Sequence, residues 1–219
     1  MFRPRGGVRD HAGRPATGHG GVPHRSRPRV TRHDPLHLTL RLVRRVRHLR
    51  TRAAAVALRA AFDGGQARFG FRLVHFSVQP GHLHLIAEAD DAVALGRGTK
   101  GLCVRIARRL NRLMGRRGRV FADRYHANIL CGPEHVRRAL VYVLQNARHH
   151  PETGAPPAGT PWADAFSSAR HFDGWAAPPP LPPAAPSAGA PVVPPRAWLL
   201  TTGWRRLPLI NPREGPPPR

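Results

Sequence analysis

His75-Phe-Ser-Val-Gln-Pro-Gly-His-Leu-His-Leu-Ile86 joins two stretches of alternating polar and apolar residues through a Pro-Gly pair. Alternation with a period of two predicts strands, and Pro80-Gly81 is a turn signal, so this stretch predicts a β-hairpin. Side chains alternate between the two faces of a strand, so His82 and His84 share one face. Leu83 and Leu85 then point from the opposite face into the core.

The flanking sequence predicts further elements on both sides of the hairpin. Apolar periodicity indicates strands at 37–42, 69–78, 82–88 and within 120–130, and helices at 51–62, 92–114 and from 133 onward. Asp91 is expected to cap the second helix, and Pro133 to open the third. The order βαββαβ plus a helix predicts an α+β, ferredoxin-like antiparallel sheet with helices on one face. The other face of the sheet would be free for a ligand or partner.

Charge and composition divide the 219 residues into three parts. Residues 1–33 carry eight arginines and one acid and predict a disordered basic arm. Residues 34–150, with 22 basic and 7 acidic residues, hold most of the periodic apolar sequence and predict one domain. Residues 151–219 contain 18 of the 25 prolines and predict a mostly disordered tail, with two apolar islands, 162–175 and 198–210, as candidates for docking.

The net charge of +24 indicates a polyanionic partner, nucleic acid before an anionic membrane. No stretch approaches 18 consecutive apolar residues, so we expect no transmembrane helix. The Arg-, Gly- and Pro-rich N-terminus lacks the apolar core of a secretory signal. Two cysteines, Cys103 and Cys131, are too few for a disulfide framework or a four-cysteine zinc site.

Two groups of residues are candidates for chemistry. His82 and His84 have the spacing to ligate one divalent metal, although a His-x-His is common by chance in a chain with 14 histidines. Tyr142 and Asn146 stand at i and i+4 on the predicted last helix, although Tyr142 taken alone fits a boundary aromatic with its hydroxyl in water better. Together they form a site in which a metal acts as a Lewis acid on a phosphodiester and a phenol attacks phosphorus.

Three segments of residues 37–150 resemble the single-tyrosine transposases of the HUH nuclease superfamily, especially the REP-associated tyrosine transposases. They are the hairpin 75–86, the stretch Val120-Phe-Ala-Asp-Arg-Tyr-His126, and the helix segment Val141-Tyr-Val-Leu-Gln-Asn-Ala-Arg148. They occur in the order and at the spacing of the family. Departures are Ala147, where relatives often have Pro, and Gln79-Pro80-Gly81, where many have Met-Pro-Asn.

The resemblance implies a role for each matched position. His82, His84 and Asn146 would be ligands of Mg²⁺ or Mn²⁺, and Tyr142 would be the nucleophile. Gln145 is a rival third ligand, and Tyr125 is a rival nucleophile that lacks a helical carboxamide partner. The family also implies a hairpin-forming single-stranded DNA substrate, a 5′-phosphotyrosine intermediate, a homodimer, and a bacterial cytoplasmic protein associated with the nucleoid.

The basic residues that follow the middle of the long predicted helix are candidates for phosphate contacts. They are Arg105, Arg108, Arg109, Arg112, Arg116, Arg117, Arg119 and Arg124.

A different class of function fits the same fold, a non-catalytic or domesticated binding protein for single-stranded DNA or an RNA hairpin. That mode stacks bases on exposed aromatics, for which Phe69, Phe71 and Phe76 are candidates. A zinc hydrolase is a distant third, because no further His, Cys or carboxylate stands at ligand spacing.

Overall fold

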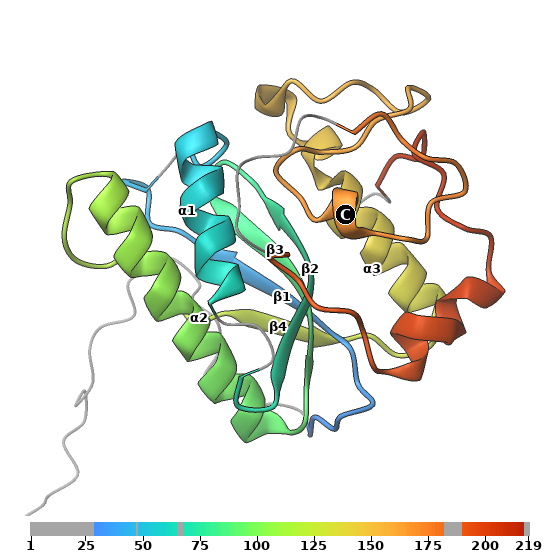
Figure 1. Ribbon diagram of the computed structural model, residues 1–219, viewed down its shortest axis with the longest axis horizontal. Coiled ribbons are helices and arrows are strands. Elements are labelled where there is room, and N and C mark those ends of the chain that lie inside the picture. Colours follow the sequence, from blue (N-terminus) through green and yellow to red (C-terminus); the bar gives the residue numbers. More distant parts are fainter. Residues whose placement is uncertain (1–28, 47, 65–67, 182–189, 217–219) are drawn as a thin grey trace, which may run out of the picture.

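The computed structural model describes residues 29–46, 48–64, 68–181 and 190–216 (Figure 1). Its main elements are, in order, β1 (Leu36–Arg41), α1 (Arg52–Asp63), β2 (Phe71–Val78), β3 (His82–Ala89), α2 (Ala92–Leu113), β4 (His126–Ile129) and α3 (Pro133–Gln145). This order confirms the predicted α+β fold. Most of the predicted basic arm, residues 1–28, lies outside the described residues. No helix among the described residues is long and apolar enough to cross a membrane.

The four strands form one antiparallel sheet in the order β2-β3-β1-β4. Thr39 of β1 lies opposite His84 of β3 on one side and His126 of β4 on the other. Helices α1 and α2 cover one face of the sheet, and α3 lies on the opposite face (Figure 1).

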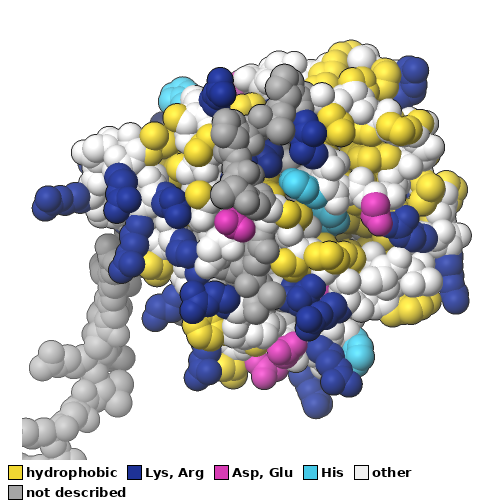
Figure 2. Space-filling view, in the orientation of Figure 1, with side chains coloured by type: hydrophobic (Ala, Val, Ile, Leu, Met, Phe, Trp, Pro, Cys, Tyr) yellow, Lys and Arg dark blue, Asp and Glu magenta, His cyan; other side chains and the backbone are white. Residues whose placement is uncertain are grey.

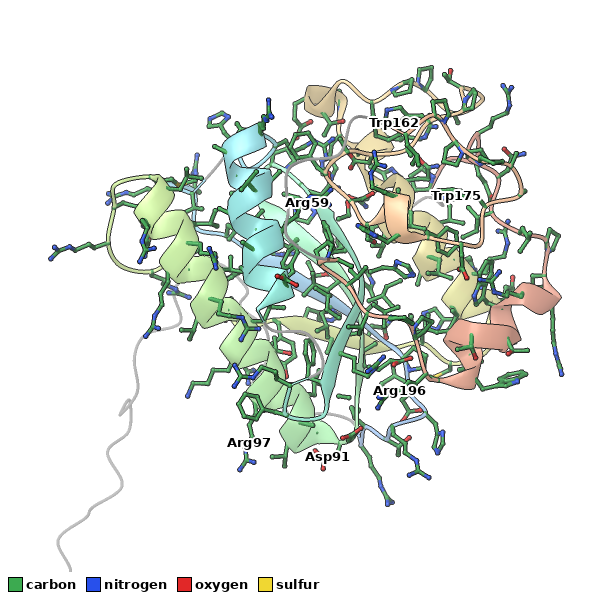
Figure 3. The ribbon with its side chains drawn as sticks, in the orientation of Figure 1. Arg59, Asp91, Arg97, Trp162, Trp175 and Arg196 are labelled. Atoms are coloured by element: carbon green, nitrogen blue, oxygen red, sulfur yellow. The ribbon has the colours of Figure 1, made fainter. Side chains whose placement is uncertain are left out.

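The face beneath α1 and α2 follows from alternation along the strands. Leu36, Leu38 and Leu40 of β1 are all buried there in the first hydrophobic core. At Gly98 of α2 an added Cβ would stand 2.1 Å from the Cβ of Phe71, so only glycine lets the helix approach β2 this closely. The predicted cap is confirmed: the Asp91 side chain accepts a hydrogen bond from the Ala94 amide at 2.7 Å (Figure 3).

The other face of the sheet carries His82, His84 and Ile86 on β3. It is covered by α3 and by residues of the 151–216 stretch, which differs from the free face that the strand order alone predicts. The physical reason is the apolar stripe of α3, in which Val136, Leu140 and Val143 are fully buried and therefore need a sheet to pack on.

The described residues of the tail, 151–181 and 190–216, are packed, whereas proline content predicts a mostly disordered segment. Trp204 is 1% exposed, stacks on Phe172 at 5.6 Å between ring centroids, and completes a second core with α3. Asp164 accepts two hydrogen bonds from Arg50, at 2.8 and 2.9 Å. Trp162 and Trp175 also lie on the α3 side (Figure 3). A few aromatic and ionic contacts thus fix a segment whose average composition is that of a linker.

Candidate active site

Two histidines of β3 meet the tyrosine of α3 across the second face of the sheet. The rings of His82 and His84 are 4.7 Å apart between centroids, nearly perpendicular to each other. The ring of Tyr142 lies edge-on to that of His84 at 5.1 Å. Tyr142 is half-buried on the flank of the buried α3 stripe, the position that its spacing predicts. The structure therefore brings together three of the four residues that the sequence singles out.

Asn146 is the fourth residue, and it follows α3 directly in a 3₁₀ turn, Asn146–His149. Its side chain is fully buried, yet neither its amide oxygen nor its amide nitrogen has a hydrogen-bond partner among the described residues. A buried amide without partners is costly, so such groups commonly mark a ligand or ion site. Burial without a protein partner is the state expected of a side chain reserved for a ligand.

Gln145, the rival third ligand, is engaged elsewhere. Its amide nitrogen donates to the carbonyl oxygens of Pro212, at 3.2 Å, and Trp162, at 3.4 Å, and its oxygen accepts from Arg148 at 3.2 Å. Gln145 therefore ties α3 to the tail. Of the two neighbouring carboxamides, only that of Asn146 has no hydrogen-bond partner among the described residues.

His37 of β1 joins the cluster, a residue to which the sequence assigns no chemical role. Its Nε2 lies 3.0 Å from Nδ1 of His84, and its ring is 5.6 Å from that of Tyr142. Burial lowers the pKa of His37 to about 4, and electrostatic interaction with His126 and His135 adds to the lowering. His37 is thus a neutral imidazole near pH 7. The available signal was its place in the alternation of β1, two residues before Thr39 on the same face.

His149 and His150 complete the surroundings. The ring of His149 is 5.8 Å from that of Tyr142, and the ring of His150 is 5.3 Å from that of His82. His149 stands seven residues after Tyr142, two helical turns on, which was a usable signal of a shared face. The 3₁₀ turn that begins at Asn146 thus leads to two residues whose rings lie near Tyr142 and near His82.

The donor set suits a divalent cation in composition. Among the described residues no group of three or more His, Cys, Asp or Glu is placed to hold a metal ion. Two imidazoles and a buried, unpartnered amide oxygen do provide three neutral donors, and a metal is a common partner of such groups. The residues present therefore fit the cation that the family resemblance implies, provided that Asn146 contributes.

Tyr125 lies in a different environment. It is partly buried against the first core, under α2, and lines a cavity together with Thr99 and Lys100 of that helix. The two histidines of β3 face the opposite side of the sheet. The structure thus separates Tyr125 from the cluster that contains Tyr142.

The predicted phosphate-binding arginines lie on the α2 side of the sheet, away from Tyr142. Arg108, Arg109, Arg112, Arg117 and Arg119 are exposed, whereas Arg105, Arg116 and Arg124 are half-buried. Arg105 donates to the carbonyl oxygen of Ala61 at 3.0 Å and so holds α1 against α2. Figure 2 shows Lys and Arg side chains along the α2 side of the molecule.

The loop after α2, which carries Arg116, Arg117 and Arg119, nevertheless reaches the end of the sheet where β3 begins. The amide of Val43 donates to the carbonyl oxygen of Val120 at 2.9 Å. The amide of Leu42 donates at the same distance to the carbonyl oxygen of Gly81, the residue before His82. The loop after α2 therefore runs past the same end of the sheet as the first histidine.

No family model and no curated protein matches this sequence. Among solved structures, a REP-associated tyrosine transposase bound to a REP hairpin is similar over 59% of this chain and 74% of its own, with 19% identity and a TM-score of 0.45. A protein from Deinococcus radiodurans R1, assigned as a transposase, is similar over 48% of this chain and 84% of its own, with 21% identity and a TM-score of 0.39. At such low identity the function has to be argued from this chain's own side chains.

Proposed function

We propose that this protein is a DNA transposase of the single-tyrosine type, which nicks and rejoins single-stranded DNA with Tyr142 as the nucleophile. The observation that supports this most is the meeting of Tyr142 with His84, at 5.1 Å between ring centroids. Four residues after Tyr142, the buried amide of Asn146 has no hydrogen-bond partner among the described residues. A phenol next to a set of metal donors is a combination that can cleave a phosphodiester through a covalent intermediate.

His82, His84 and Asn146 would hold a divalent cation, Mg²⁺ or Mn²⁺. When bound, the cation supplies Lewis-acid polarisation of the scissile phosphate. Imidazoles that bind metals use their second ring nitrogen in a hydrogen bond that fixes the tautomer. The contact between His37 and Nδ1 of His84 supports metal binding through Nε2 of His84, with His37 as a positioning residue.

The proposed step is an exchange at phosphorus. The phenolic oxygen of Tyr142 forms a bond to phosphorus, the bond from phosphorus to the 3′ oxygen breaks, and the phenolic proton ends on that oxygen. The products are a 5′-phosphotyrosine and a free 3′-hydroxyl. Attack by a different 3′-hydroxyl reverses the step, joins new strands and restores the phenol without an external energy source.

The substrate we expect is a hairpin-forming single strand, held through its phosphates by the exposed arginines of α2 and its following loop. Homodimer formation, which the family resemblance implies, stays a prediction.

The structure does not favour the non-catalytic alternative in which bases stack on aromatic residues of the sheet. A sheet that binds single strands by stacking needs exposed aromatics on its strands. Phe71 and Phe76 are each 1% exposed, and Phe69 lies before β2 rather than on it. A domesticated transposase that binds DNA without cutting it is the form of the alternative that remains to be tested.

The test incubates the full chain with labelled single strands from the flanks of its own gene, with Mn²⁺ or with EDTA. We expect a covalent adduct that needs metal and that is absent in Tyr142→Phe. Tyr125→Phe is the matched control and should keep the adduct. Adducts that persist in Tyr142→Phe and vanish in Tyr125→Phe would show that Tyr125, and not Tyr142, is the nucleophile. Binding without any adduct would favour the non-catalytic alternative.

A further inference from the structure

A cavity of about 650 Å³ opens at the end of the sheet where β3 begins. Its lining comes from four separate parts of the chain and includes Leu42, Arg44, Arg50, Gly81, Glu152 and Phe166. His48, also in the lining, has a φ of 60°, a costly conformation for a residue other than glycine. Such strain is commonly retained where a site requires it.

The cavity borders the candidate active site. Gly81 directly precedes His82 in the chain. On the other side, Oε1 of Glu152 lies 3.6 Å from Nδ1 of His150, whose ring is 5.3 Å from that of His82. A strand whose phosphate reaches the histidines therefore has the cavity beside it.

The lining combines an apolar wall with cations. Leu42, which is 7% exposed, Val43 and the half-buried Phe166 supply the apolar part of the lining, and the guanidinium of Arg50 lies over one face of the Phe166 ring at 4.5 Å. Arg50 is itself held by its paired contact with Asp164, so this wall is rigid. Arg44 is exposed in the lining and adds a positive charge. Unpaired bases stack on aromatic rings and on guanidinium groups, with their phosphates on nearby cations, so a guanidinium held over a ring beside apolar side chains suits a base.

We propose that this cavity receives an unpaired base of the DNA strand that Tyr142 cuts, with an adjoining phosphate on Arg44. The proposal rests on the proposed function and adds a subsite to it. It means that the protein itself contacts a base close to the cleaved phosphate.

Gly81 allows a direct test, because a Cβ added there meets no atom within 4 Å and its φ is outside the left-handed region. The full chain carrying Tyr142→Phe, which cannot cut, is titrated by fluorescence anisotropy with a thymidine octamer and with an abasic octamer of equal phosphate number. We expect the thymidine octamer to bind at least about five-fold tighter, from stacking of one base. Adding Gly81→Phe should fill the cavity and abolish this preference, whereas Gly81→Ala should keep it.

Arginine variants separate the phosphate contact from the base contact. Arg44→Ala should weaken binding of both octamers to a similar extent, and Arg45→Ala, an exposed neighbour outside the lining, should weaken them less. Circular dichroism melts establish that each variant is folded.

Two results would overturn the proposal: equal affinity for the two octamers in the parent, or a preference that survives in a folded Gly81→Phe variant. Because no cleavage is involved, the outcome is independent of the adduct assay. A base preference that depends on Gly81, in a chain that forms no adduct with any DNA, would refute the proposed chemistry and leave the base-binding cavity established.

Discussion

Replacing His37 with phenylalanine removes the ring nitrogen that lies 3.0 Å from Nδ1 of His84, while keeping a flat ring in the same buried place. Loss of the partner of a metal-binding histidine typically weakens metal affinity about 10- to 100-fold, or about 1.4 to 2.7 kcal/mol. In this site the hydroxyl of Thr39 lies 3.3 Å from the same nitrogen and can take over part of the task. We therefore expect a loss near the lower end of that range, about ten-fold.

The assay is calorimetric titration of the full chain with Mn²⁺ at pH 7.5, beside urea unfolding without metal. Unfolding should change by no more than about 1 kcal/mol, because one neutral hydrogen bond is lost. His37→Gln is the conservative control, since its amide oxygen can accept the hydrogen bond and should restore most of the affinity. Affinity in His37→Phe within two-fold of the parent would refute the positioning role. A parent chain that binds no Mn²⁺ would refute the metal site itself.

Four further outcomes follow from the same contacts. In the same two assays, Asn146→Ala should weaken Mn²⁺ binding without lowering the metal-free stability by more than about 1 kcal/mol, because its amide has no partner among the described residues. Gln145→Ala should do the opposite: it should lower stability by about 1–3 kcal/mol, because a buried hydrogen bond to Pro212 is lost, and leave Mn²⁺ affinity unchanged. Trp204→Ala should cost about 3–5 kcal/mol in urea unfolding, because it empties the second core. Burial lowers the pKa of His75 from 6.5 to about 4, so as the pH falls the unfolded chain takes up this proton before the folded chain does. The contribution of neutral His75 to the free energy of unfolding is therefore complete above pH 6.5 and falls by about 3 kcal/mol toward pH 4. This loss should be absent in His75→Gln when urea unfolding is compared across pH. Arg109→Ala should reduce the slope of log affinity against log salt for a single strand by about 0.7, and an unchanged slope would place Arg109 outside the DNA contact.

Much of the domain was predictable from local patterns. The alternation of 75–86, the Pro80-Gly81 turn and the cap at Asp91 locate the hairpin and α2 to within a residue or two of the observed bounds. The relation between His82 and His84 follows from strand geometry alone, and the flank position of Tyr142 from helix periodicity. These features depend on neighbours in sequence, which is why the sequence contains them.

Contacts between distant segments account for what could not be predicted. The engagement of Gln145 depends on Pro212, 67 residues further along the chain, in a tail whose proline content suggests a linker. His37 lies 47 residues from His84, and only the register of β1 against β3 brings them together. The covering of the second sheet face by α3 likewise depends on tertiary packing and not on strand order.

The most direct test of the central claim is the identity of the residue that becomes joined to DNA. The adduct formed with Mn²⁺ is digested with nuclease and trypsin, and the modified peptide is sequenced by mass spectrometry. We predict a nucleotide on the phenolic oxygen of Tyr142, linked through its 5′ phosphate. A nucleotide on Tyr125, or on any residue outside the cluster of His82, His84 and Tyr142, would contradict it.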